Sequence, residues 1–197
     1  MQGNTVSTQV EAKILATNKL IRNTYMLLAM TLVFSAVTAT LSVFLRLPPM
    51  TYLLSLGGAI VLMWFVLPRT ANSTSGIGVV FGITGLLGLG LGPLLSMYLS
   101  LPNGPQIVAT ALGGTGVIFF ALSGYALTTR RNFNFMGGFL ATGFLVVLAA
   151  SLVNIFLGIP AFSLAISATV VMLMSGFLLY ETSQMVHGGQ DNYVLAT

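Results

Sequence analysis

Charged residues are scarce in this chain, and cysteine is absent. Only 5% of the 197 residues are charged while 56% are hydrophobic, whereas an ordinary soluble domain has about 25% charged residues. No polar half remains that could form a separate soluble domain, so length and composition together indicate one integral membrane unit. The absence of cysteine excludes disulfides, thiol catalysis and thiolate metal sites.

The chain also has few residues that do chemistry. A metal site needs several converging ligands, and a serine hydrolase needs a base held beside its nucleophile by an orienting group. With three acidic residues and a single histidine, neither arrangement is visible in the sequence. We therefore predict no enzyme, no metal site and no cofactor. The net charge of +4 does not indicate nucleic acid, because the basic residues are scattered at the ends of apolar runs, as membrane topology requires.

Six apolar runs are candidates for crossing a bilayer, which takes about 20 residues as a helix. Because the runs are continuous rather than alternating, they indicate helices and not β-barrel strands. We predict an all-α, multi-span helical bundle preceded by a flexible, polar, cytoplasmic tail over residues 1–23. The predicted spans cover residues 24–45, 51–67, 76–99, 106–128, 135–157 and 161–180.

Basic residues lie almost entirely on one side of these spans. The opposite loops contain only Arg46. Since cytoplasmic loops carry the excess of lysine and arginine, the amino terminus is predicted to be cytoplasmic. The residues on that side are Lys13, Lys19 and Arg22 before the first span, Arg69 after the second, and Arg130 and Arg131 after the fourth.

The sixth span ends with an acidic residue, Glu181, where the second and fourth end with arginine. At 1.5 Å per residue, residues 161–180 cover about 30 Å, which places Glu181 at the cytoplasmic interface. Two interpretations stay open: a hydrated interfacial carboxylate, or a gate or sensor that pairs with Arg69 or with the Arg130 and Arg131 pair. His187 is a candidate pH sensor. Asp191 comes shortly after two glycines, so we interpret it as a turn residue rather than a metal ligand.

The segment "GITGLLGLGLGP" at residues 82–93 lies inside an apolar span, and no Gly-Lys-Ser/Thr follows it, so phosphate binding is not predicted. Its glycines favour close helix packing, with a loosened helix for gating as the second interpretation. Asn154 near the outer end of the fifth span is expected to make a hydrogen bond to another helix. The predicted packing residues are Gly82, Gly85, Gly88, Gly92 and Asn154.

Four motifs occur in order and carry a family resemblance. They are "NTYMLLAMTLVFSAVTA" from Asn23, "GLGLGPLL" from Gly88, "NIFLGIPAFSLAIS" from Asn154 and "ETSQMVHGGQDNYVLAT" from Glu181. With these motifs the chain resembles the Bax inhibitor-like membrane proteins, and within them the bacterial YccA branch, from about residue 19 to residue 197. The motif that begins at Glu181 is the most specific.

The resemblance implies a seven-helix bundle in a bacterial inner membrane that binds and restrains the membrane-anchored, ATP-dependent zinc protease FtsH. Other branches of the family are described as pH-sensitive calcium leak channels, gated by one carboxylate on the sixth helix and one on the seventh. Glu181 occupies the sixth-helix position. The implied partners are therefore FtsH and the lipid bilayer, with calcium or protons in the alternative. Since the chain stops at Thr197, where a seventh helix would begin, we expect a fragment rather than a six-span protein.

Overall fold

The computed structural model describes residues 2–129, 131–187 and 192–197, and every regular element in these ranges is helical. Six helical stretches are long and apolar enough to cross a membrane among the described residues, which confirms the all-α, multi-span prediction. The elements are α1 (Gln2–Phe44), α2 (Met50–Val61), the π-helix η1 (Leu62–Val66), α3 (Leu67–Thr70), α4 (Thr74–Leu99), α5 (Gly104–Thr129), α6 (Met136–Leu157), α7 (Pro160–His187) and α8 (Tyr193–Ala196).

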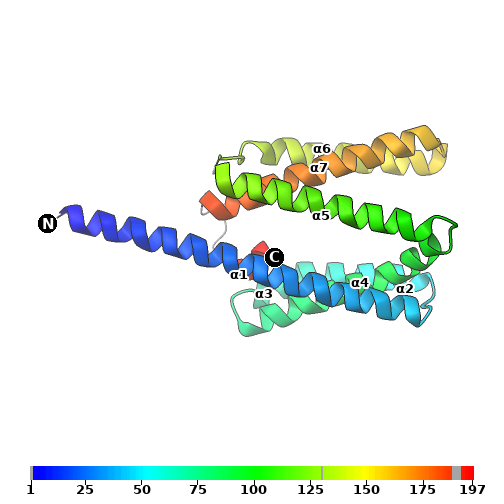
Figure 1. Cartoon of the computed structure of the whole chain (residues 1–197), viewed down its shortest axis with the longest axis horizontal. Coiled ribbons are helices and arrows are strands. Elements are labelled where there is room, and N and C mark those ends of the chain that lie inside the picture. The colour runs from blue at the N-terminus through cyan, green and yellow to red at the C-terminus, as the bar shows by residue number, and fades with distance from the viewer. Residues whose placement is uncertain (1, 130, 188–191) are drawn as a thin grey trace. The chain divides into compact units, whose positions relative to one another are not determined.

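The amino-terminal segment differs from its prediction, because residues 2–23 continue α1 as helix rather than forming a flexible tail. Between Asn4 and Leu47 the chain has no glycine or proline to interrupt a helix. Extending an existing helix fixes one residue for each new hydrogen bond, whereas starting one is costly. The apolar span therefore supplies the nucleus from which the polar segment can continue as helix. Figure 1 shows this first part of α1 extending past α2, α3 and α4.

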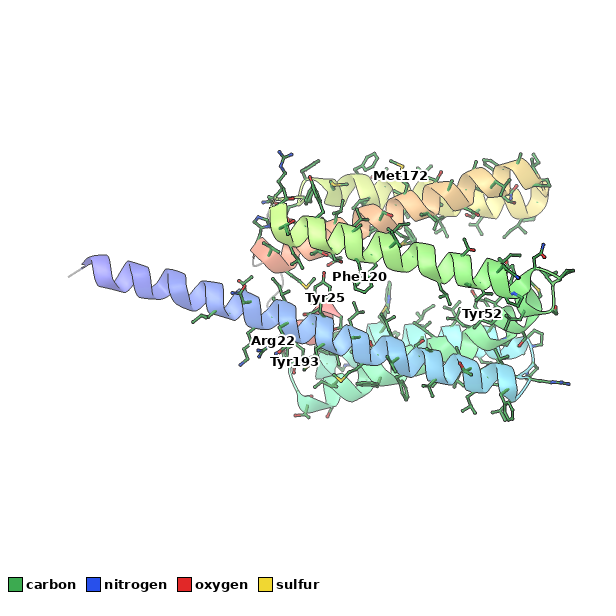
Figure 2. The ribbon with its side chains drawn as sticks, in the orientation of Figure 1. Arg22, Tyr25, Tyr52, Phe120, Met172 and Tyr193 are labelled. Atoms are coloured by element: carbon green, nitrogen blue, oxygen red, sulfur yellow. The ribbon has the colours of Figure 1, made fainter. Side chains whose placement is uncertain are left out.

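The chain folds as two compact units, and α5 runs from one into the other. The first unit contains Met1–Gly113 together with Gln190–Thr197, and the second contains Gly114–Gly189. Large apolar side chains are exposed throughout both, as expected for helices that face lipid. Phe156 is 89% exposed and Met172 is 73% exposed, and Figure 2 shows Met172 pointing outward from α7.

In the first unit, α4 packs on α1 through a row of glycines. A Cβ atom at Gly85 would lie 2.8 Å from the Phe34 ring, one at Gly88 would overlap Thr38, and one at Gly92 would overlap Ser42. These glycines are three or four residues apart, so they share one face of α4. A Cβ at Gly82 would instead lie 3.5 Å from a side-chain carbon of Leu62 in η1. The absence of side chains thus lets α1 and α4 approach closely.

Pro93 lies inside α4 and deprives the Leu89 carbonyl of its normal partner, since proline has no N–H to donate to the residue four positions before it. Ser42 on α1 replaces that donor. Its hydroxyl donates to the Leu89 oxygen at 2.7 Å, and its side chain is fully buried. The α1–α4 interface therefore satisfies a backbone group that α4 cannot satisfy alone.

Ser42→Ala is expected to destabilise the protein by about 1–3 kcal/mol, because it leaves the part-buried Leu89 carbonyl without a donor at the α1–α4 interface. In a Pro93→Ala background the cost should fall, since an alanine has a backbone N–H that can donate to the Leu89 carbonyl. The measurement is the free energy of unfolding of the four proteins in a double-mutant cycle. Additive effects of the two substitutions would show that Ser42 does not act through Leu89.

A second proline perturbs the second span. Pro68 cannot donate to the Trp64 carbonyl, and just before it the helix widens to the π-helix η1, in which the Leu67 N–H bonds to the Leu62 carbonyl. Arg69 then donates from Nη1 to the Phe65 carbonyl at 3.0 Å. The segment Met50–Thr70 is thus one candidate membrane span despite the proline.

The second unit contains an antiparallel hairpin of α6 and α7. Its two helices interlock through leucines placed opposite glycines: a Cβ at Gly176 would lie 2.7 Å from Leu140, and one at Gly143 would lie 2.8 Å from Leu173. Leu140 is 1% exposed. α6 ends at Leu157, and the φ of 61° at its cap, Gly158, is the left-handed conformation that glycine adopts without strain.

Candidate functional site

The polar end of α7 contains two of the residues that the sequence singled out, Glu181 and His187. Ser183 is fully buried there and ties α7 to the segment between α5 and α6. Its hydroxyl accepts a hydrogen bond from the Phe133 backbone N–H at 3.0 Å and donates to the Arg131 carbonyl at 3.2 Å. The Ser183 hydroxyl thus pairs with one backbone N–H and one backbone carbonyl of this loop, which no helical hydrogen bonds would otherwise satisfy.

His187 lies one helical turn after Ser183 and is the last residue of α7. Its Nδ1 is 2.9 Å from the Ser183 carbonyl oxygen and 3.3 Å from the Ser183 hydroxyl oxygen. A carbonyl can only accept, so Nδ1 carries the hydrogen in this arrangement. The imidazole therefore cannot use Nδ1 to take the serine proton, and the pair is not a nucleophile with its base.

Tyr180 and Gln184 extend the same face of the helix. Gln184 donates from Nε2 to the Tyr180 hydroxyl at 2.8 Å, and the Tyr180 ring lies over Gly137 of α6, about 3.1 Å from where a Cβ would be. The four residues Tyr180, Ser183, Gln184 and His187 are three, four and seven residues apart, so they share one face of α7 and form a hydrogen-bonding helix end. Its chemistry is that of a structural polar cluster.

Glu181 points away from this face and its side chain is exposed. Within the described residues of its own unit it has no hydrogen-bond or ion-pair partner. Its role as a gate or sensor stays a prediction, since an exposed carboxylate in the last two turns of α7 fits both open interpretations. Its neighbours Thr182 and Ser183 are both buried.

The basic candidates are placed as follows. Arg69 is exposed at the end of α3 and bonds to its own helix. Arg131 is exposed, and its backbone carbonyl belongs to the Ser183 cluster. Arg130 and Asp191 lie outside the described residues. Among the residues that are described, no group of three or more His, Cys, Asp or Glu side chains converges.

A clamp formed by Asn192 was not predicted. Its side-chain Nδ2 donates to the Ala71 carbonyl at 2.9 Å and to Asn72 Oδ1 at 2.8 Å, while its Oδ1 accepts from the Val194 N–H at 2.8 Å. Val194 is 3% exposed, and α8 packs against α1. The sequence signal was an asparagine before a short apolar segment, which identifies a helix cap but not its distant partners.

Asn154 makes the cross-helix contact expected of it. From α6 its Nδ2 donates to the Ser163 hydroxyl of α7 at 2.6 Å, while its Oδ1 is buried without a partner among the described residues. The glycines Gly85, Gly88 and Gly92 lie in the close α1–α4 contact described above, whereas a Cβ at Gly82 would make only an ordinary van der Waals contact with Leu62.

The comparisons with known proteins cover nearly the whole chain. The family profile described as "Inhibitor of apoptosis-promoting Bax1" matches residues 17–197. The protein named "Modulator of FtsH protease YccA" of Escherichia coli strain K12 is 48% identical over 191 residues, which are 97% of this chain and 86% of that protein. An "Inner membrane protein YccA" of Escherichia coli O6:H1 matches equally. An "Uncharacterized membrane protein" of Vibrio cholerae is 44% identical over 183 residues, covering 93% of this chain and 82% of that protein.

Proposed function

The chain belongs to the Bax inhibitor family, and we propose that it is a bacterial inner-membrane protein that binds and modulates the protease FtsH. The observation that carries the proposal is the 48% identity, over 97% of the chain, to a protein named as a modulator of that protease. An enzymatic role has no support in the polar end of α7, where the serine and histidine are arranged as a structural cluster.

Contact with the protease would come from two parts of the chain. The helices present exposed apolar side chains along their spans, and these can pack against membrane helices of a partner. α1 has 43 residues, about 64 Å at 1.5 Å per residue, whereas the hydrocarbon is about 30 Å thick. The first part of α1 therefore reaches beyond the bilayer, where a soluble part of the protease can meet it.

The proposed orientation has the amino terminus and the polar end of α7 in the cytoplasm, because six of the seven basic residues lie on that side of the spans. Since the chain has no cysteine, single introduced cysteines can report on it. A cysteine at Asn103 should react with a membrane-impermeant maleimide added to intact cells with a permeable outer membrane. One at Ser7, which precedes the candidate span that begins at Leu15, should react only after lysis. The reverse pattern would invert the topology.

The functional test is degradation of a membrane substrate of FtsH in cells that make this protein in abundance. A bound modulator should lengthen the substrate half-life, and the chain should co-purify with FtsH from detergent-solubilised membranes. The control is a membrane protein of similar size and expression level from outside the family. It should neither co-purify nor change the half-life.

The alternative is a pH-sensitive cation leak gated by Glu181, with His187 and Arg131 as the described groups of its own unit that could sense or pair with it. In that case the substrate half-life would be unchanged and FtsH would not co-purify. Glu181→Gln would instead abolish calcium flux into vesicles that contain the purified chain, or remove its dependence on pH. That combined result would replace the modulator by the leak.

A further inference from the structure

The turn between α1 and α2 has an arginine where a helix commonly ends with glycine. The Leu47 N–H donates to the Ser42 carbonyl at 3.2 Å. The Arg46 N–H donates to the Val43 carbonyl at 3.1 Å. These two bonds form the Schellman motif, in which the residue just past the helix takes a left-handed conformation, usually as glycine. Here that residue is Arg46, with a φ of 51°, and no other non-glycine residue in the described ranges has a positive φ.

A turn of matching sequence at the end of α6 has glycine at this position. The segment "FLRLP" at residues 44–48 corresponds to "FLGIP" at residues 156–160, so Arg46 and Gly158 are equivalent. Gly158 has a φ of 61°. Glycine adopts such angles without a steric penalty, whereas a residue with a Cβ atom is strained. A strained residue that persists where glycine would fit indicates a role for its side chain.

Contacts within the chain do not account for the Arg46 side chain. It is exposed, and its guanidinium has no hydrogen-bond or ion-pair partner among the described residues of its own unit. A cation is favourable near the carboxyl end of a helix, but lysine would supply the same charge. In the predicted topology Arg46 is also the one basic residue on its side of the spans, against six on the other. We therefore expect the partner of this guanidinium outside the chain.

The neighbours of Arg46 place that partner at the membrane surface. The turn lies between two candidate spans, Leu15–Phe44 and Met50–Thr70. Phe44 is 82% exposed and Met50 is 64% exposed, as expected of side chains that face acyl chains. The arginine between them is then at the depth of the lipid headgroups, where phosphate is the abundant anion. A guanidinium has a planar fork of N–H donors that binds phosphate oxygens in pairs.

We propose that Arg46 binds the phosphate of an anionic phospholipid of the phosphatidylglycerol class and anchors the α1–α2 turn in the headgroup layer. The phosphate of phosphatidylglycerol keeps its full negative charge, whereas phosphatidylcholine has a cation of its own that offsets it. The exposed Phe44 and Met50 side chains would lie along the acyl chains of the bound lipid. This site involves neither the protease nor Glu181, so its failure would leave the proposed function untouched.

The test is the thermal midpoint of the purified full-length chain in a neutral detergent. The two lipid probes are phosphatidylglycerol and phosphatidylcholine with the same acyl chains. A ligand that binds only the folded state stabilises it, so phosphatidylglycerol should raise the wild-type midpoint by roughly 3–8 °C more than phosphatidylcholine does. Arg46→Gly should lose this preference, and Arg46→Lys should keep only part of it, because lysine retains the charge without the fork.

Three outcomes would overturn the proposal. The first is an equal preference for phosphatidylglycerol in the wild type and in Arg46→Gly. The second is a midpoint that the glycine substitution shifts equally in both lipids, which would show that Arg46 serves only the end of the helix. The third is an equal rise with soluble glycerol phosphate at the same concentration, which would show that the ligand is a free phosphate and not a lipid.

A transplant and a matched control locate the site. Gly158→Arg in the Arg46→Gly background should restore part of the preference, because Gly158 has the same left-handed φ, open space around a Cβ and the exposed Phe156 beside it. The control Arg69→Gln should retain the preference, since Arg69 is exposed but already donates to the Phe65 carbonyl. If the control loses it as fully as Arg46→Gly, or if the transplant restores nothing, the assignment to an arginine in this turn fails.

Discussion

Gly88→Ala is expected to destabilise the protein strongly, whereas Gly78→Ala on the same helix is expected to be neutral or stabilising. A Cβ atom at Gly88 would overlap the Thr38 hydroxyl and the Ser35 backbone carbonyl of α1. The backbone of α1 cannot move aside as a flexible side chain can, so the helices must separate. Overpacking of this kind costs about 1–3 kcal/mol and occasionally more.

The control has the opposite sign because Gly78 has nothing within 4 Å of a Cβ. There alanine only improves helix propensity, by about 0.5–1 kcal/mol. The measurement is the thermal midpoint of the purified proteins in mild detergent, followed by size-exclusion chromatography. Gly92→Ala should resemble Gly88→Ala, since its Cβ would overlap Ser42. If all three variants have the same thermal midpoint, the glycines of α4 do not set the distance between α1 and α4.

The spans could be predicted from the sequence because lipid leaves the backbone only one local solution. A continuous apolar segment must satisfy its own hydrogen bonds as a helix, and each of the six predicted runs overlaps one of the six candidate spans found among the described residues. The first span was harder to bound, since residues 2–23 are polar yet helical. Polarity indicates where a helix leaves the bilayer and not where it ends.

Long-range polar contacts could not be predicted. Pro93 indicates that the Leu89 carbonyl lacks a donor, but no local pattern identifies Ser42, which lies 47 residues away. The same holds for Ser183 and Phe133, 50 residues apart, and for Asn192 and Ala71, 121 residues apart. A serine in an apolar helix has the same sequence signal whether it bonds to its own helix or joins two segments.

Glu181 illustrates why the candidate site was harder to predict than the spans. Its near neighbour Ser183 is buried and bonded to the loop between α5 and α6, whereas Glu181 is exposed and unpaired within the described residues of its unit. The sequence drew attention to the charge because charge is rare in this chain. The structure draws attention to the serine, because one hydroxyl joins a helix to a distant loop. Rarity identifies a residue worth testing, while connectivity identifies one that organises the site.

Deleting residues 3–14 is expected to slow degradation of the protein itself by FtsH while leaving co-purification with FtsH intact. These residues are the part of α1 that precedes its candidate membrane span, which begins at Leu15. Helix ends fray, and the first residues of a domain are poorly ordered unless they are tied down. This end of α1 should therefore unfold transiently and offer the protease a segment to engage. The half-life of the protein after synthesis is stopped is the observable.

A matched replacement separates fraying from sequence recognition. If residues 3–14 are exchanged for a Gly/Ser-rich segment of the same length, the segment is unstructured but has lost every native side chain. Rapid turnover should then persist, because engagement requires an accessible unfolded segment. Slow turnover in both variants would instead show that the protease recognises specific residues in this part of α1. Loss of co-purification on deletion would place the binding surface in the extension and not in the spans, so the modulator would hold FtsH through the same segment by which it is degraded.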